Sequence, residues 1–330
     1  MEHIEEQIED FSENEMEQNS LPVDDNIVLN VENLSVIIKD RFLIKNAYLS
    51  VKKGESWAIL GEKKSGKTSL LKAISGSLPI HPGQVYISGV DIFENKQALA
   101  NVGISLDPPV FFKYQTVYDN LKFISILNER NNKEKILQVL NDLGIAHTLN
   151  KRVLFLPYYE KKLMSLAVAF LSQPKLLLLD EPFKNLPKES LQKVKNEIRK
   201  FRENGTTIII STTKFETVED DCDNFIFMEE REIKQILPKE ECEKLCSAPP
   251  LAFVRVKYPH FAGKLIQDNF NLEVKIMDRR VLFDADEDTT ADIVKFLSQN
   301  KIAIYKAGFL SKKAEKIFVS LTPYYKEELS

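Results

Sequence analysis

The spacing of hydrophobic residues changes repeatedly along the chain between two patterns. Short runs rich in Val, Ile and Leu predict strands, and stretches with an apolar residue every three or four positions predict helices. The predicted strands are 27–38, 47–51, 56–60, 84–88, 102–106, 175–179 and 206–211, and the predicted helices are 67–74, 116–127, 133–143, 159–171 and 188–203. This alternation of strands and helices predicts a largely parallel α/β sheet, with the apolar run at 175–179 in its centre.

The composition changes at Ala248-Pro249-Pro250, which predicts a domain boundary. Beyond it we expect strands at 251–258, 272–277, 280–284 and 302–306, and helices at 260–270, 288–299 and 311–320. Residues 248–330 would thus form a small α+β domain, and no residue pattern in them indicates chemistry. The larger domain would span residues 26–247.

Charge separates the first 25 residues from the rest. They contain ten acidic residues and no Lys or Arg, whereas the whole chain has 49 acidic and 45 basic residues. A segment with one sign of charge and few large apolar residues cannot bury enough surface to offset the entropy lost on ordering. We therefore predict a disordered acidic tail over residues 1–25; alternatively, the tail folds on a basic surface of a partner.

The composition also excludes several classes of protein. None of the 330 residues belongs to an apolar run long enough for a transmembrane helix, and three cysteines provide no disulfide framework. A net charge of −4 argues against a nucleic-acid partner. We expect a cytoplasmic protein of two domains.

Residues 61–68 read Gly-Glu-Lys-Lys-Ser-Gly-Lys-Thr, which fits the phosphate-binding pattern G-x-x-x-x-G-K-[ST]. The glycines let the backbone wrap so that its N–H groups face the phosphates. Lys67 would reach the β- and γ-phosphates, and the Thr68 hydroxyl would bind Mg²⁺. The predicted nucleotide-binding residues are Gly61, Glu62, Lys63, Lys64, Ser65, Gly66, Lys67, Thr68 and Ser69.

The apolar strand at 175–179 ends in two carboxylates, Asp180 and Glu181. Acidic residues at the carboxyl end of a strand lie where open α/β sheets bind ligands. We expect Asp180 to hold Mg²⁺ and Glu181 to act as the general base on the attacking water.

These motifs, in this order, resemble the ATP-binding cassette (ABC) family of transporter ATPase subunits over residues 27–240. Further landmarks are Gly54-Glu55, residues 83–89, residues 116–121, Pro174-Lys175 and Cys222-Asp223. The C-terminal segment, with Ala314-Glu315-Lys316-Ile317-Phe318, resembles the small tail domain of bacitracin-resistance and related multidrug-export ATPases. The resemblance implies a P-loop NTPase fold, ATP and Mg²⁺ as cofactors, and a place at the inner face of the cell membrane.

The resemblance also implies two kinds of partner, an integral membrane permease and a second cassette. In the family, each ATP lies between the phosphate loop of one cassette and the L-S-G-G-Q signature of the other. The segment 108–119, with Phe111, Phe112 and Tyr114, would receive the coupling helix of the permease.

Several positions depart from the family pattern. The signature position holds Leu156-Pro157-Tyr158-Tyr159-Glu160, and no glycine occurs between Gly144 and Gly205. Pro157 offers neither an N–H nor a hydroxyl to a phosphate. Thr213 stands at the switch histidine and Pro187 at the D-loop aspartate. Asp107 replaces the Q-loop glutamine and still supplies a hard oxygen for Mg²⁺.

Three functions are compatible with these residues. The first is a transporter ATPase subunit whose catalytic site is completed by a partner cassette with an intact signature. The second is a regulatory cassette that binds Mg-ATP and hydrolyses it little or not at all. The third is a P-loop protein outside transport, such as a kinase or a soluble ATP-driven switch.

Overall fold

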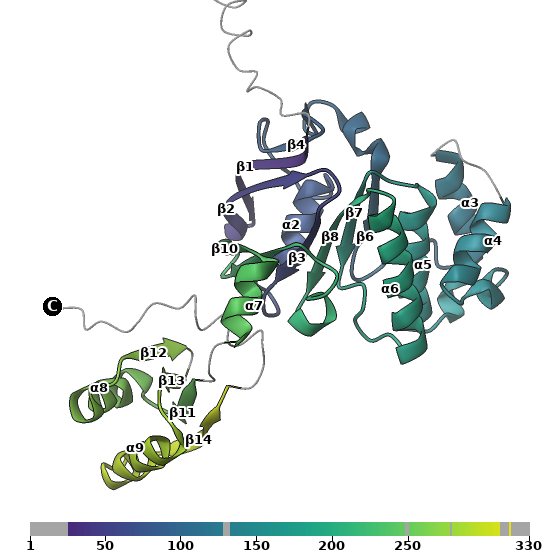
Figure 1. Ribbon diagram of the computed structural model, residues 1–330. Helices are drawn as coiled ribbons and strands as arrows, with labels where there is room; N and C mark the ends of the chain where they lie inside the picture. Colours follow the sequence, from purple (N-terminus) through teal and green to yellow (C-terminus); the bar gives the residue numbers. More distant parts are fainter. Residues whose placement is uncertain (1–25, 128–132, 248–250, 278, 311–316, 318–330) are drawn as a thin grey trace, which may run out of the picture. The chain divides into compact units, whose positions relative to one another are not determined.

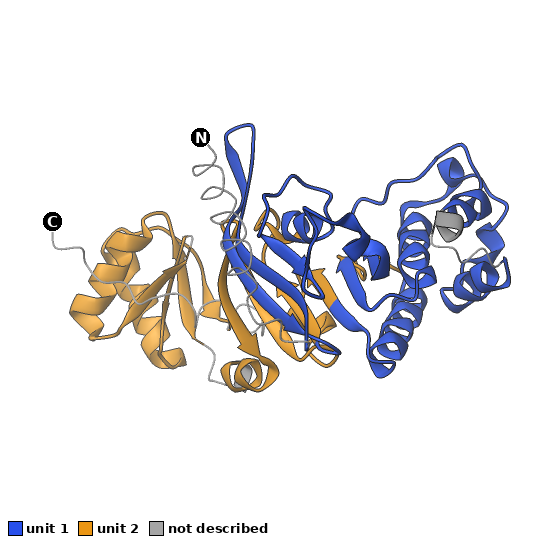
Figure 2. Ribbon diagram, turned by 90° about the horizontal axis from the view of Figure 1, so that it is seen from above, with its two compact units in different colours: residues 1–55, 68–179, 187–208 blue, residues 56–67, 180–186, 209–330 orange. Residues whose placement is uncertain are grey.

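The computed structural model describes residues 26–127, 133–247, 251–277, 279–310 and 317 (Figure 1). The chain forms two compact units, coloured separately in Figure 2. Unit 1 comprises residues 1–55, 68–179 and 187–208, and unit 2 comprises residues 56–67, 180–186 and 209–330. The predicted acidic tail, the predicted boundary at 248–250 and most of the predicted helix 311–320 lie outside the described residues, so these remain predictions.

Unit 1 contains an antiparallel sheet with the strand order β2-β1-β4-β5. Its strands are β1 (Ile27–Ile38), β2 (Arg41–Lys52), β4 (Val85–Ile87) and β5 (Val90–Asp91). The sequence predicts a largely parallel sheet for the domain as a whole, and these four strands instead form a separate antiparallel sheet. Strands β1 and β2 form a hairpin because Lys39 and Asp40, which link them, both have positive φ values of 49° and 58°. Such turns match the twist of paired antiparallel strands.

Unit 1 also contains a pair of parallel strands and four helices, which lie between these strands or after them along the chain. Strand β6 (Val102–Ser105) pairs in parallel register with the first four residues of β7 (Leu176–Asp180). Every residue of β7 is buried, as predicted for a central strand. The helices are α3 (Val117–Leu127), α4 (Lys133–Asp142), α5 (Tyr158–Leu171) and α6 (Lys188–Glu203).

In unit 2 the strands follow the order β10-β9-β3-β8. They are β3 (Ser56–Leu60), the end of β8 (Thr207–Thr212), β9 (Asn224–Glu229) and β10 (Glu232–Pro238). Strands β3 and β9 are parallel, whereas β10 returns antiparallel to β9. Strand β10 and helix α7 (Lys239–Ser247) were not predicted, because few apolar residues mark them.

Residues 252–309 of unit 2 form an antiparallel sheet of order β12-β13-β11-β14 with two helices. The elements are β11 (Ala252–Val256), α8 (Pro259–Phe270), β12 (Val274–Met277), β13 (Arg280–Phe283), α9 (Glu287–Gln299) and β14 (Ile304–Phe309). Val254, Ile266 and Ile293 belong to one buried cluster, so one face of the sheet packs on α8 and α9 (Figure 1). The six elements appear in the predicted order. No helix in the described part of the chain has the length and apolar character needed to cross a bilayer.

Candidate functional site

The predicted phosphate loop connects strand β3 to helix α2 (Lys67–Ile74). Strand β3 is buried along its whole length and fixes the start of the loop. Lys64 and Gly66 have φ values of 70° and 111°, a region that few residues other than glycine occupy. A Cβ atom added to Gly61 would lie 2.5 Å from Ser65 Oγ and closer still to the carbonyl oxygen of Met228. The loop is therefore folded too tightly for a side chain at position 61.

The ammonium group of Lys67 is held inside this loop. Its Nζ donates hydrogen bonds to the carbonyl oxygens of Gly61, at 2.7 Å, and Glu62, at 2.9 Å. Only 6% of the residue is exposed, and this burial lowers the pKa of the ammonium. The carboxylates of Glu181 and Asp180 act in the opposite direction and raise that pKa. The phosphate loop and the acidic strand end are thus close enough for their charges to interact.

Ser65 provides an unpaired polar group in the same loop. Among the described residues, its Oγ is the buried side-chain oxygen or nitrogen that has no hydrogen-bond partner within the protein. A buried hydroxyl without a partner costs free energy unless a ligand supplies the missing hydrogen bond. The Ser65 backbone is fixed, because its carbonyl oxygen accepts from the N–H of Arg231 at 2.9 Å. A phosphate oxygen would satisfy this hydroxyl, so the loop fits the predicted nucleotide.

Asp180 and Glu181 are positioned by a residue that sequence reasoning did not assign to the site, Ser211 at the end of β8. The Ser211 hydroxyl donates a short hydrogen bond to Oδ1 of the fully buried Asp180. The N–H of Glu181 donates to the carbonyl oxygen of Ser211 at 3.0 Å and to its Oγ at 3.1 Å. The sequence feature that could have identified Ser211 was its position, as a serine at the end of a neighbouring apolar strand.

Glu181 itself has a positive φ of 48°, an uncommon conformation for a residue other than glycine. The two contacts from its N–H to Ser211 hold the backbone in this conformation. Backbone strain of this kind concentrates at functional sites, where it fixes the direction of a side chain. The predicted general base therefore stands on a constrained segment of chain.

The third predicted metal ligand, Asp107, has a different environment. Its carboxylate belongs to unit 1, where Oδ1 accepts a short hydrogen bond from Tyr158 Oη. The same oxygen lies 3.5 Å from Nζ of the fully buried Lys162. Both partners come from α5 and compete with a metal ion for that oxygen. Metal binding by Asp107 stays a prediction, as do the roles of Thr68 and Ser69 in the first turn of α2.

The segment at the signature position, residues 156–160, forms the start of helix α5. Pro157 is the N-cap residue, and its side chain makes no capping hydrogen bond. The Tyr158 hydroxyl donates a hydrogen bond to Asp107. Glu160 Oε1 lies 3.0 Å from His147 Nε2 and accepts a hydrogen bond from Tyr159 Oη at 3.3 Å. The side chains of this segment are thus committed to contacts within the chain.

The steric restriction at position 61 yields a prediction. We expect Gly61→Ala to lower the free energy of unfolding by about 1–3 kcal/mol, because the added methyl group must displace the Ser65 side chain or backbone. Chemical denaturation would measure the loss, and the melting temperature in Mg-ATP would report the nucleotide site. In contrast, Gly205→Ala introduces a strained positive φ but meets no atom within 4 Å. It should therefore preserve the response to Mg-ATP; an equal loss of that response in both variants would contradict the argument.

Comparison with known proteins agrees with this site. The ABC transporter family matches residues 44–184. An uncharacterized ABC transporter ATP-binding protein of Bacillus subtilis, YdbJ, is 25% identical over 91% of this chain and 97% of its own length. The linearmycin resistance ATP-binding protein LnrL of Bacillus subtilis is 26% identical over 67% of this chain and 71% of its own length.

The fold agrees as well. A solved ATP-binding subunit of an ABC transporter matches 66% of this chain and 92% of its own length, with a TM-score of 0.60 and 20% sequence identity. This match has the P-loop NTPase fold, and a second solved ATP-binding cassette, which matches with a TM-score of 0.59, is bound to ADP and Pi. The phosphate loop and the acidic strand end both lie within residues 44–184, the part of the chain that matches the ABC transporter family, and the chain is similar over most of its length to an ABC transporter ATP-binding protein.

Proposed function

We propose that this chain hydrolyses ATP in a composite site shared with a second cassette, and thereby drives export through a membrane permease. The observation that carries the proposal is the start of helix α5. The chain retains its own phosphate loop and acidic strand end, whereas the segment that would face the partner's ATP is Leu156–Glu160. One of the two composite sites would therefore be competent and the other impaired.

Within the competent site, we assign the following roles to the residues of this chain. The backbone N–H groups of residues 61–66 and the ammonium of Lys67 bind the phosphates. Asp180 and Thr68 would hold Mg²⁺, which neutralises charge on the phosphate oxygens when bound. Glu181 accepts a proton from the attacking water, and Ser211 holds the Asp180 carboxylate and the backbone of Glu181 in place.

The impaired site follows from the chemistry of residues 156–160. A signature sequence binds the opposing γ-phosphate through backbone N–H groups, a hydroxyl and a helix N-terminus. Pro157 lacks an N–H, and the Tyr158 hydroxyl is bound to Asp107. Loss of one preorganised donor to a transition-state oxygen typically slows a reaction by roughly 10²–10³-fold. We infer slow turnover wherever this segment must complete a site.

The direction of transport and the cellular location are part of the same proposal. LnrL is named for resistance to linearmycin, and the lantibiotic transport ATP-binding protein SrtF of Streptococcus pyogenes is named for lantibiotic transport. Resistance to a toxic compound, as in the name of LnrL, favours export as the direction. A chain with this role would lie at the cytoplasmic face of the membrane, bound to its permease.

The test compares ATPase rates of the purified chain alone and of the chain mixed with candidate partner cassettes. The isolated chain should turn over roughly 10²–10³-fold more slowly than the pair, because only the partner supplies an intact signature. A signature serine-to-alanine change in the partner should return the pair to the slow rate. Full-rate turnover by the isolated chain would refute the composite site.

A second candidate, a regulatory cassette that binds Mg-ATP without useful hydrolysis, is favoured by position 213. Thr213 occupies the place of the switch histidine and is exposed just after β8. Threonine has no imidazole to offer the γ-phosphate. The substitution of Glu181 argued in the Discussion separates the two candidates.

A further inference from the structure

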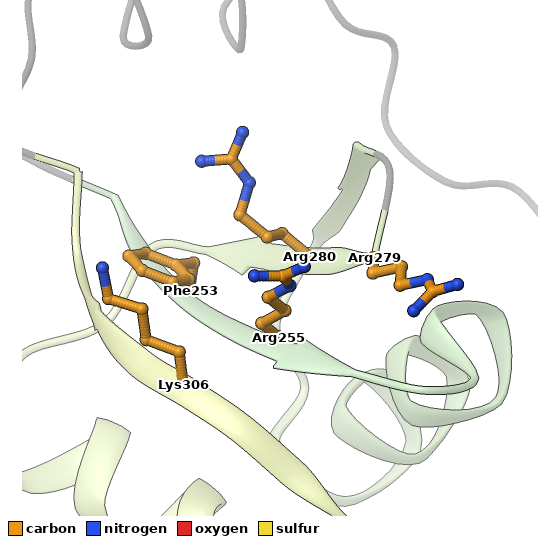
Figure 3. A pocket seen from close by; sticks show the side chains of 5 residues that line it. All are labelled: Phe253, Arg255, Arg279, Arg280 and Lys306. Atoms are coloured by element: carbon orange, nitrogen blue, oxygen red, sulfur yellow. The ribbon is translucent and has the colours of Figure 1, made fainter.

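The C-terminal sheet carries a pocket of about 450 Å³ that is lined almost entirely by cations (Figure 3). Its volume is that of a small-molecule site. The lining residues are Phe253 and Arg255 from β11, Arg279 and Arg280 at the start of β13, and Lys306 from β14. Figure 3 shows Lys306, Arg255 and Arg280 near the Phe253 ring, whereas the Arg279 side chain points away from it.

The register of the strands places three of these cations in one row. Strand β11 lies between β13 and β14, and Arg255 is directly opposite both Arg280 and Lys306. Residues directly opposite each other share a face of the sheet, and like charges in such pairs destabilise it. Within the described part of the chain, no acidic side chain forms an ion pair with Arg255, Arg279 or Lys306. Like charges therefore lie directly opposite each other in both of these pairs.

Phe253 supports this row from the neighbouring position on the same face. The guanidinium carbon of Arg280 lies 5.9 Å from the centre of its ring, and Nζ of Lys306 lies 5.8 Å from it. Both distances allow a cation–π interaction. Because only 6% of Phe253 is exposed, the ring positions the two cations and offers little surface for stacking a base.

We propose that this pocket binds a phosphate-bearing anion with several negative charges, such as an oligophosphate or the phosphate headgroups of anionic lipids. Guanidinium groups present forked donors that match phosphate oxygens in a bidentate manner, and three of the four cations are arginines. A multiply charged anion would also remove the repulsion between Arg255, Arg280 and Lys306.

The site is independent of the catalytic proposal, since it shares no residue with the phosphate loop or the acidic strand end. Its ligand contacts come from residues 253–306 alone. A failure of ATP hydrolysis would leave the proposal intact, and a failure of this pocket would leave the nucleotide site intact.

The experiment titrates the full chain with sodium tripolyphosphate by isothermal titration calorimetry. The wild-type chain should bind two equivalents, one at the phosphate loop and one here, and the double variant Arg255→Gln/Lys306→Gln should bind one. If the phosphate loop does not bind tripolyphosphate, the wild type should bind one equivalent and the double variant none. Lys295→Gln also removes a positive charge, but from an exposed position on α9. It should bind tripolyphosphate with the stoichiometry and affinity of the wild type. Equal stoichiometry and affinity in the double variant and the wild type would overturn the proposal.

Vesicles distinguish the two sources of phosphate. Cosedimentation with phosphatidylglycerol vesicles that is lost in the double variant and reversed by tripolyphosphate would identify lipid headgroups. Binding of tripolyphosphate without cosedimentation would identify a free oligophosphate. Without ligand, the double variant should also melt roughly 1–4 °C higher than the wild type, because the repulsion is removed. Absence of both binding modes in the wild type would refute the site.

Discussion

Replacing Lys67 by alanine should abolish the thermal stabilisation that Mg-ATP gives the protein. A ligand at one hundred times its dissociation constant stabilises the folded state by about 2.7 kcal/mol, which corresponds to roughly 5–10 °C for a protein of this class. The loop holds the ammonium of Lys67 through two hydrogen bonds to backbone carbonyl oxygens. Alanine removes this ammonium and both hydrogen bonds. Differential scanning fluorimetry with and without Mg-ATP measures the effect.

The apo protein should tolerate this change. Burial lowers the pKa of Lys67, so the charged ammonium costs stability in full below its folded-state pKa, and this cost falls as the pH rises from that value to the ordinary lysine pKa of 10.5. At neutral pH, removal of the ammonium relieves this cost and offsets the two lost hydrogen bonds. Lys72→Ala, in the last turn of the same helix, is the matched control and should retain the full response. Retention of the response by Lys67→Ala would refute the nucleotide site.

The parts of the site that depend on local sequence could be predicted. The phosphate loop is contiguous, so its glycines and Lys67 identify the backbone wrap and the cation without knowledge of the fold. Asp180 and Glu181 follow an uninterrupted apolar strand, and in the structure their carboxylates raise the pKa of Lys67. Similarly, helix α6 begins and ends where the periodicity of its apolar residues predicts.

The parts that depend on distant contacts could not be predicted. Ser211 and Arg231 reach the site only because β8 and the turn after β9 approach the loop in space. The partners of Asp107 are 51 and 55 positions away along the chain, so its hydrogen bond with Tyr158 and its ion pair with Lys162 left no pattern in the sequence. Likewise, the apolar strands β1 and β2 gave no indication that they pair antiparallel.

Glu181→Gln should lower the ATPase rate of the assembled transporter by about 10²–10⁴-fold while Mg-ATP binding is preserved. A positioned general base contributes about this much to a rate, and the amide of glutamine cannot accept the proton of the attacking water. The change preserves the size of the side chain, and the N–H of residue 181 keeps both hydrogen bonds to Ser211. The variant should therefore lose turnover but keep its stabilisation by nucleotide. Steady-state phosphate release and fluorimetry on the same preparation would measure the two quantities.

The result also decides between the two candidate functions. In an ATPase subunit, the complex with Glu181→Gln would assemble and hold ATP but would not turn over. In a regulatory cassette, Glu181→Gln would leave turnover unchanged, whereas Lys67→Ala would block assembly because the bound nucleotide is then a structural requirement. Glu203→Gln, an exposed carboxylate at the end of α6, controls for the loss of one negative charge and should have no effect on either measurement. Because the two candidates share the phosphate loop and differ only in the need for a base, position 181 distinguishes them where position 67 alone cannot.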